Sequence, residues 1–412
     1  MNHITEEKIY ALALYEAHGL GSAGLRKLLD AFGSPTEIME QKEEEIEKVL
    51  GRKLVTNIFS KHRKNRDGFW QDCYNAYQKM ESEGIHFCYC REEEYPKRLL
   101  EIPDYPFGLY YKGSLPKENL PCVSIIGARE CSEYGRKCAE LYGKILASYG
   151  VQIISGMARG VDGISQTAAL EVGGTSFGIL GSGVDVCYPR ENSRLYEALI
   201  KEGGVISEFA PGTEAKSSFF PMRNRIISGL ADILLVVEAR KKSGTYITVC
   251  QALEQGKEIF AVPGRITDGL SDGCNRLIEA GAGIATDPVV ILEALGCMEG
   301  NLNSQMKIEN TGKVRSTKAT EVTKIAKDIE KTIGEEPRIQ DSSMIFDDEA
   351  DHVEKCAVMK ALEETPKRME EILEEIRHYG VDLSYTDLLC LLTELCIEGR
   401  AEGGGDYYRA IR

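Results

Sequence analysis

The middle of the chain alternates short apolar runs with longer stretches of helical apolar spacing. The short runs contain no polar alternation, which is the pattern of strands buried on both faces. They cover residues 122–126, 151–154, 175–180, 204–207, 233–237 and 258–262. The helical stretches between them cover residues 134–149, 160–172, 192–202, 222–230 and 246–255. This alternation predicts an α/β fold with a doubly wound parallel sheet, whose ligands bind at the carboxyl ends of the strands.

The first 80 residues show helical spacing and no strand pattern. Helices are predicted over residues 4–18, 23–32 and 35–50. Between the first two, the stretch from Gly19 to Gly24 matches the spacing GxGxxG, but it follows a helix where a dinucleotide site requires a strand. It is typical of a helix-hairpin-helix, whose amides hold a DNA phosphate, or of a plain tight turn. The acidic run at residues 41–47 favours the plain turn.

The end of the chain divides into two further segments. Residues 299–349 are polar and charged without sustained apolar periodicity, which predicts a flexible linker. Residues 350–412 predict three helices and a glycine-tipped hairpin, typical of a winged helix. The third of these helices carries Asp387, Glu394 and Glu398 and no basic residue, so we expect it to contact protein rather than the DNA major groove. The predicted domains are 1–80, 95–298, 299–349 and 350–412.

Composition limits the class of protein. No run of 18 apolar residues occurs in the 412, and the 13 cysteines form no CxxC pair, so we expect a cytoplasmic protein with reduced thiols and no membrane segment. The formal net charge of −15 argues against binding duplex DNA. Residues 121–290, however, carry 17 Lys and Arg against 19 Asp and Glu. A local basic groove is therefore compatible with the acidic whole.

The central segment lacks the residues of most catalytic sites. None of the six histidines falls between residues 121 and 290, which excludes a Ser-His-Asp triad and most zinc sites there. No GxxxxGK[ST] motif occurs, so ATP hydrolysis in a P-loop is not expected. Of the carboxylates Asp162, Asp185, Glu208 and Glu238, we expect Asp162 to cap its helix or to anchor an arginine such as Arg159. The sequence predicts no catalytic residue, cofactor or metal, and therefore no enzyme.

Three glycine-rich turns follow predicted strands. They are Gly127-Ala128-Arg129, the stretch from Ser155 to Gly160, and the stretch from Gly181 to Asp185. Glycine allows close approach of the backbone to a ligand and lets amides point at an anion. The first two turns also carry Arg129, Gly156 and Arg159. Together they predict an anion-binding edge.

The segment from Phe219 to Ile227 combines aromatic and basic residues at the start of a predicted helix. Pro221 suits the first turn of a helix, and the arginines after it lie near the positive end of the helix dipole. Arg223 and Arg225 would bind phosphate, and Phe219 or Phe220 would stack a base. The alternative is a surface ion-pair cluster with two buried phenylalanines. The segment alone leaves both open.

Taken together, these motifs resemble the DNA-processing protein A family (DprA/Smf). The matches run in order from Tyr95-Pro96 to Gly283 and include Ile126-Gly127-Ala128-Arg129, Ser155-Gly156-Met157-Ala158-Arg159-Gly160, Tyr188-Pro189, Phe220-Pro221-Met222-Arg223-Asn224-Arg225 and Ser243-Gly244-Thr245. The resemblance implies an extended Rossmann-like domain, flanked by an N-terminal helical domain of the SAM or helix-hairpin-helix kind and a C-terminal winged helix.

The resemblance also implies a function and a set of contacts. Members bind single-stranded DNA, form homodimers, protect incoming DNA and help to load the RecA recombinase during DNA uptake and recombination. Arg129 would hold a phosphate, and the remaining DNA contacts would come from Gly156, Arg159, Arg190, Lys216, Phe219, Arg223, Asn224 and Arg225. One departure is Gln166, which stands where the family often has a histidine.

Two other functions fit parts of the pattern. Related Rossmann-like folds include phosphoribohydrolases, in which the glycine turns would hold one phosphate and Glu238 would serve as the catalytic carboxylate. The absence of a clear Pro-Gly-Gly-x-Gly-Thr loop counts against this enzyme. A protein-only adaptor is the third possibility, but it leaves the arginines of the glycine turns and of the 219–227 segment without a role.

Overall fold

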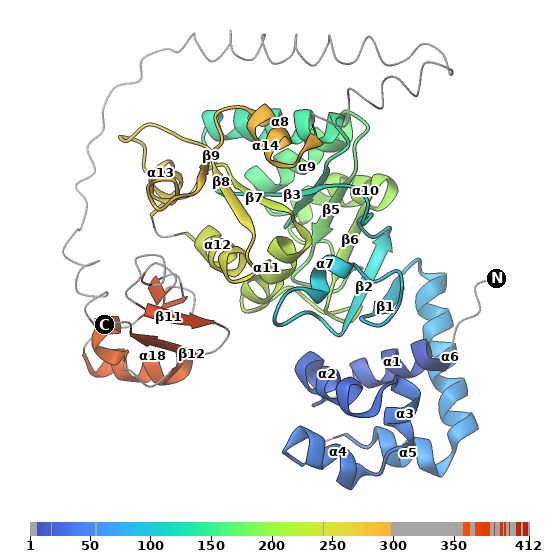
Figure 1. Cartoon of the computed structure of the whole chain (residues 1–412). Coiled ribbons are helices and arrows are strands. Elements are labelled where there is room, and N and C mark those ends of the chain that lie inside the picture. Colours follow the sequence, from blue (N-terminus) through green and yellow to red (C-terminus); the bar gives the residue numbers. More distant parts are fainter. Residues whose placement is uncertain are drawn as a thin grey trace, which may run out of the picture.

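The structure is a computed structural model. It describes residues 6–17, 19–53, 56–241 and 243–297, and parts of the chain from 357 to 410 (Figure 1). The predicted linker at 299–349 lies outside the described residues, as does most of the predicted helix at 384–398. Of the helices in the described part, none is both long and apolar enough to cross a membrane.

A nine-stranded sheet forms the centre of the molecule, in the order β1-β2-β6-β5-β4-β3-β7-β8-β9. Its strands are β1 (His86–Tyr89), β2 (Gly108–Gly113), β3 (Cys122–Ile126), β4 (Gln152–Ser155), β5 (Ser176–Ile179), β6 (Gly204–Ser207), β7 (Ile233–Val236), β8 (Glu258–Ala261) and β9 (Gly283–Ile284). Strands β3 to β9 run parallel, and β2 pairs antiparallel with both β1 and β6. The α/β prediction is confirmed, and the prediction of a wholly parallel sheet is wrong at one edge.

Helices cover both faces of this sheet. They are α7 (Lys97–Leu100), α8 (Glu133–Ser148), α9 (Val161–Glu171), α10 (Ser193–Glu202), α11 (Phe219–Leu230), α12 (Thr245–Glu254), α13 (Asp272–Glu279) and α14 (Pro288–Ala294). Val123 and Ile125 pack with α8, α9 and α14, whereas Ile126 packs into the cluster that contains Ile226 and Val249 of α11 and α12. The strands are apolar throughout because alternate residues enter these two cores.

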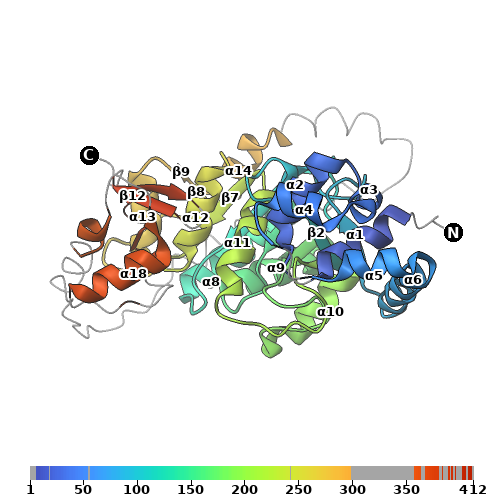
Figure 2. The same cartoon turned by 90° about the horizontal axis from the view of Figure 1, so that it is seen from below.

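Six helices precede the sheet, and they are gathered at its β1–β2 end (Figures 1 and 2). They are α1 (Glu6–Glu16), α2 (Gly21–Phe32), α3 (Pro35–Glu40), α4 (Glu43–Leu50), α5 (Ile58–Lys64) and α6 (Arg66–Ser82). The single helix predicted over residues 35–50 is two helices. The first begins with Pro35 after the Ser34 side chain caps it, and the chain is extended at Gln41 and Lys42 before α4 begins.

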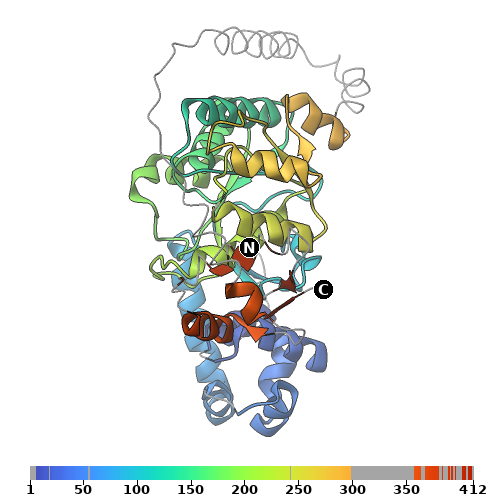
Figure 3. The same cartoon turned by 90° about the vertical axis from the view of Figure 1, so that its left-hand side faces the viewer.

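These N-terminal helices share one apolar core with the sheet. A continuous cluster of buried side chains runs from Ile9 on α1 through Phe87 on β1 to residues of the central strands. The ring of Tyr15 lies 5.8 Å from that of Phe87 and 5.7 Å from that of Phe107. Figure 3 shows the blue N-terminal helices as a layer beneath the sheet domain. Both interpretations of the stretch from Gly19 to Gly24, the favoured plain turn and a site for a DNA phosphate, stay predictions.

The described C-terminal residues form a small unit with an apolar cluster of its own. Helix α18 (Met369–His378) follows β10 (Lys367–Arg368), and a hairpin of β11 (Ala401–Gly404) and β12 (Tyr407–Ala410) pairs with β10. They agree with one of the three helices and with the glycine-tipped hairpin that the sequence predicts within residues 350–412. The assignment of the whole unit as a winged helix stays a prediction.

Candidate nucleic-acid interface

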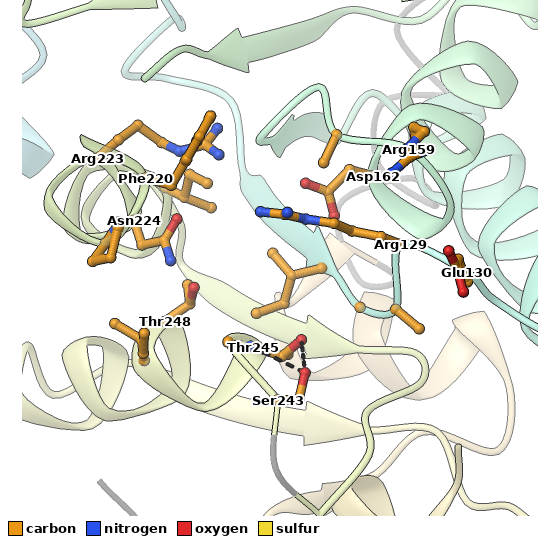
Figure 4. Close-up of a pocket in the computed structure, with 18 of the residues that line it drawn as sticks. Arg129, Glu130, Arg159, Asp162, Phe220, Arg223, Asn224, Ser243, Thr245 and Thr248 are labelled. Atoms are coloured by element: carbon orange, nitrogen blue, oxygen red, sulfur yellow. Dashed lines mark hydrogen bonds between the residues drawn. The ribbon is translucent and has the colours of Figure 1, made fainter. Parts of the chain in front are cut away.

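The strand order reverses between β3 and β7, which lie side by side at the middle of the sheet. The chain leaves the two strands in opposite directions, so a crevice opens at their carboxyl ends. A cavity of about 660 Å³ lies there, which we call the switch-point cavity (Figure 4). Its walls come from the segments that follow β3 to β8, and from α9, α11 and α12.

Helix α11 supplies one wall. Phe220, Arg223, Asn224 and Ile227 all line the cavity, and their spacing of i, i+3, i+4 and i+7 places them on one helical face, the cavity face. The helix begins at Phe219, three residues before the predicted start, so Pro221 lies within its first turn as predicted. The Asn224 side-chain amide makes no hydrogen bond within the described part of the chain, and it points into the cavity (Figure 4).

Three exposed arginines also line the cavity: Arg129, Arg159 and Arg240. The Arg129 guanidinium reaches in from the wall opposite Asn224 and lies 5.7 Å from the Phe220 ring centre (Figure 4). Neither Arg159 nor Arg240 has an ion-pair or hydrogen-bond partner among the residues that the structure describes. Arg240 was not predicted, although it follows the predicted strand at 233–237, just as Arg129 follows the strand at 122–126.

Arg223 is a buried member of the cavity face, with 4% of its surface exposed. Its Nη1 donates to the carbonyl of Gly156 at 2.8 Å and to the carbonyl of Ile179, whereas its Nε has no partner within the described structure. Burial lowers the pKa of this guanidinium to about 10, against the opposing pull of the Asp162 carboxylate. Arg223 therefore contributes positive charge just behind the cavity surface.

Gly156 and Asp162 support Arg223. The Gly156 amide donates to Asp162 Oδ2 at 3.1 Å, and a Cβ at Gly156 would lie 2.5 Å from the Arg223 Nη1. The absence of a side chain at Gly156 thus makes room for Arg223, and the Gly156 amide, a predicted DNA contact, is already bonded to Asp162. Burial raises the pKa of Asp162, and Arg223 is the largest influence that opposes it. The sequence left open whether Asp162 caps its helix or anchors an arginine such as Arg159. The structure places Arg223 beside it, and α9 has no side-chain cap.

Arg225 lies outside the cavity lining. Its Nη1 and Nη2 donate to the Glu208 carboxylate at 2.9 and 2.7 Å, and its Nε lies 2.8 Å from an Asp104 carboxylate oxygen. A further bond runs from Nη1 to the carbonyl of Met222. The guanidinium is thereby engaged inside the protein. This matches the ion pair of the alternative that the sequence left open, although the pair is buried and does not lie on the surface. We leave Arg225 out of the proposed DNA contacts.

The remaining predicted residues lie outside the lining of the cavity. Phe219 stacks on Phe209 with ring centres 4.2 Å apart, and the Lys216 ammonium lies 5.5 Å from the Phe219 ring. Arg190 is exposed in a short 3₁₀ turn. The aromatic rings in the cavity are instead Phe220 and the half-exposed Tyr188, 5.5 Å apart.

Gln166 has a structural position. Its Oε1 accepts the Met157 amide at 3.1 Å, and its Nε2 donates to the carbonyl of Phe177 at 3.0 Å. Met157 has a φ of +53°, which is uncommon for a residue other than glycine. The fully buried Gln166 therefore holds the turn that presents the Gly156 carbonyl to Arg223.

The carboxylate on which a phosphoribohydrolase would depend is not in the cavity. Glu238 is fully buried and accepts the amide and the hydroxyl of Ser132, the N-cap of α8. Among the described residues that line the cavity there is no histidine or cysteine. Nor does the described part of the chain contain a cluster of three side chains that could hold a metal ion.

Known proteins match the part of the chain that forms this cavity. The family model of DNA recombination-mediator protein A matches residues 86–296. DNA processing protein DprA of Streptococcus pneumoniae is 44% identical over 192 residues, which are 47% of this chain and 68% of the relative. Protein Smf of Escherichia coli is 42% identical over 217 residues, 52% of this chain and 58% of the relative.

A solved structure matches as well. The crystal structure of DprA from Streptococcus pneumoniae superimposes with a TM-score of 0.59 at 34% identity, covering 70% of this chain and 98% of that one. The family match spans the sheet from β1 to β9 and every wall of the switch-point cavity. The chain belongs to the family of DNA recombination-mediator protein A, also called DprA or Smf.

Proposed function

We propose that this protein binds single-stranded DNA in the switch-point cavity. The observation that supports this most directly is the pairing of exposed cations with an exposed aromatic face in one recess. Arg129, Arg159 and Arg240 would contact phosphates, and Phe220 with Tyr188 would stack a base. Arg223 would strengthen the positive potential from behind. Such contacts recognise the backbone and the face of any base, so binding is sequence-tolerant and sensitive to salt.

A recess favours a single strand over a duplex. A flexible strand can bend a phosphate and its base into a cavity, whereas a duplex presents its phosphates on a rigid outer surface. The whole-chain charge of −15 adds repulsion for any nucleic acid that contacts more than the cavity region. We therefore expect weak duplex binding at physiological salt.

We extend the proposal to a mediator role in the cytoplasm. A protein that holds single strands through their backbone protects them and can pass them to a recombinase, and the family to which the chain belongs supports this role. We propose the RecA recombinase as the partner, a homodimer as the working form, and no catalytic turnover. The buried position of Glu238 supports the last point, because this carboxylate lies outside the cavity lining.

The first test is fluorescence anisotropy of a labelled oligo-dT and a matched duplex at physiological salt. We expect tight binding of the single strand by the wild type, weak binding of the duplex, and at least about a tenfold loss of affinity in Arg129→Ala/Arg240→Ala, since each phosphate contact is a charge-assisted bond. Lys144→Ala/Lys201→Ala is the matched control, because it removes two charges outside the cavity lining. Equal losses in the two double variants would overturn the site.

The mediator role has its own test. RecA filament formation is measured on oligo-dT coated with single-strand-binding protein, with and without this protein. Faster filament formation with the wild type, lost in Arg129→Ala/Arg240→Ala, is expected. Unchanged rates with a protein that binds DNA normally would reject RecA loading and leave DNA binding intact. Light scattering after gel filtration would decide between monomer and homodimer.

A further inference from the structure

Two series of contacts connect the N-terminal helices to a single side chain on helix α11. That side chain is Arg225, which lies in the middle of α11 beside Asn224. Its guanidinium is held from one direction by Glu208 and from another by Asp104. Each of these carboxylates belongs to a segment that an N-terminal helix contacts through a polar bond.

The first chain begins on α1. The Tyr15 hydroxyl donates to the main-chain carbonyl of Glu208 at 2.6 Å. The Glu208 carboxylate then accepts both terminal nitrogens of Arg225, in the bidentate geometry that fixes the plane of a guanidinium. The side chains of this pair are only 8% and 10% exposed. The position of Glu208, and hence of Arg225, is thus tied to Tyr15.

The second chain begins on α2. Arg26 donates to the main-chain carbonyl of Tyr105 and lies 4.5 Å from the centre of the Tyr105 ring. The residue before Tyr105 is Asp104, whose carbonyl accepts the Arg225 Nε at 3.1 Å and whose carboxylate lies 2.8 Å from the same nitrogen. Two different N-terminal helices therefore converge on one guanidinium.

An arginine held on two sides fixes the rotation of the helix that carries it. Residues 220 and 224 of α11 lie on the cavity face, and a turn of the helix about its axis would move Phe220 and Asn224 out of the cavity together. We propose that Tyr15 and Arg26 are positioning residues, which act through Glu208, Asp104 and Arg225 to set α11 for DNA binding. The N-terminal helices are then a support of the DNA site. The effect on DNA affinity rests on the proposed function, whereas the effect on the position of α11 does not.

Other polar bonds join α1 to the sheet domain without leading to α11, and they provide a matched control. The Tyr89 hydroxyl donates to Glu7 at 3.2 Å, and the Lys8 ammonium lies 3.2 Å from Glu92 and 2.6 Å from Glu94. Tyr15→Phe/Arg26→Met and Tyr89→Phe/Lys8→Met each remove one hydroxyl and one cation between the same two layers. They differ in whether the lost bonds continue to Arg225.

The experiment compares the two double variants with the wild type by three readouts. Amide hydrogen exchange over residues 219–230 should become faster in Tyr15→Phe/Arg26→Met and stay unchanged in the control. Affinity for oligo-dT should fall about fivefold or more in the first variant and less than about twofold in the control, given the usual worth of two hydrogen bonds. Thermal midpoints are measured to compare the stability that each variant loses.

The readouts separate the two proposals. Faster exchange in α11 together with weaker DNA binding supports the positioning role. Equal exchange and equal affinity in the two variants would overturn it, since the N-terminal bonds would then act on stability alone. If the wild type fails to bind oligo-dT, the proposed function falls, and exchange in α11 still decides whether Tyr15 and Arg26 set this helix.

Discussion

The two faces of helix α11 differ more than their sequences suggest. On the cavity face, within the described part of the chain, the Asn224 side chain makes no hydrogen bond, and of the three guanidinium nitrogens of Arg223 only Nη1 makes one. On the opposite side, which we call the support face, Arg225 is engaged by two carboxylates and Gly229 packs against Leu99 and Ile102. One helix therefore presents unused bonding capacity on one side and nearly saturated bonding on the other.

This difference shows what decides the role of an arginine in such a motif. Arg223 and Arg225 are two positions apart, so they project in different directions from the helix. Both are buried, yet only the first borders the cavity. Because both residues are arginines, the difference between them comes from the elements packed around each one.

Arg225→Ala tests most severely whether the two faces differ. Removing Arg225 leaves the buried Glu208 carboxylate without its main partner, which should lower the free energy of unfolding by about 3–5 kcal/mol. Urea denaturation measures this loss, with Arg129→Ala as the exposed control that should leave the free energy almost unchanged. If the two variants prove equally stable, the support face does not exist as described.

Salt titration of DNA binding addresses the cavity face. Each lost phosphate contact on a single strand reduces the slope of log affinity against log salt by about 0.7, so Arg129→Ala/Arg240→Ala should flatten the slope by about 1.4. Arg225→Lys keeps the charge on the support face and should leave the slope at the wild-type value. A change in slope for Arg225→Lys as large as for the double variant would contradict the division between the faces.

The aromatic pair offers a finer test. Phe220→Leu removes the ring that borders the cavity and should weaken oligo-dT binding by about 1–3 kcal/mol, the usual worth of one stacked base. Phe219→Leu should have a smaller effect, because its ring is already stacked on Phe209. Anisotropy titrations of both variants measure the difference. The reverse order of effects would place the base on Phe219.

The buried carboxyl of Asp162 should make stability depend weakly on pH. Burial raises the pKa of its carboxyl above the ordinary 3.8, so the folded state binds this proton more tightly than the unfolded state. The resulting stability is fully present below pH 3.8 and is lost as pH rises through the higher folded pKa. Asp162→Asn keeps an oxygen for the Gly156 amide and removes this pH dependence.

Two measurements check this variant. Urea denaturation between pH 3 and pH 7 should show wild-type stability falling relative to Asp162→Asn as pH rises. At pH 7 the variant should also bind oligo-dT about twofold more tightly, because one negative charge near the phosphates is gone. Parallel curves of stability against pH for the two proteins would contradict a raised pKa of the Asp162 carboxyl in the folded state.

Much of the fold follows from the sequence because the central strands are buried on both sides. β3 and β6 begin and end where the apolar runs predict, and the other four predicted strands differ by one residue at one or both ends. Strands β1 and β2 were not predicted, because their packing depends on Tyr15 and other residues of the distant N-terminal helices. β9 has only two residues, too few for a pattern.

The site was predictable at the level of loops but not of individual side chains. The strand-end turns pointed to Arg129 and Arg159, and both residues line the cavity. The choice between Phe219 and Phe220 depends on where α11 begins and on the Phe209 ring, ten residues away in the chain. Likewise, the partners of Arg225 come from residues 104 and 208, and local spacing contains no information about them.

The core shared between the N-terminal helices and the sheet has a practical consequence. The family match begins at residue 86, but the buried cluster begins at Ile9, so the region that the family model matches is shorter than the unit that shares one core. A fragment that starts at β1 would expose the side chains on which α1 packs, and it should be prone to aggregation. Expression of the sheet domain without the C-terminal unit should therefore keep the chain from α1 to α14 intact.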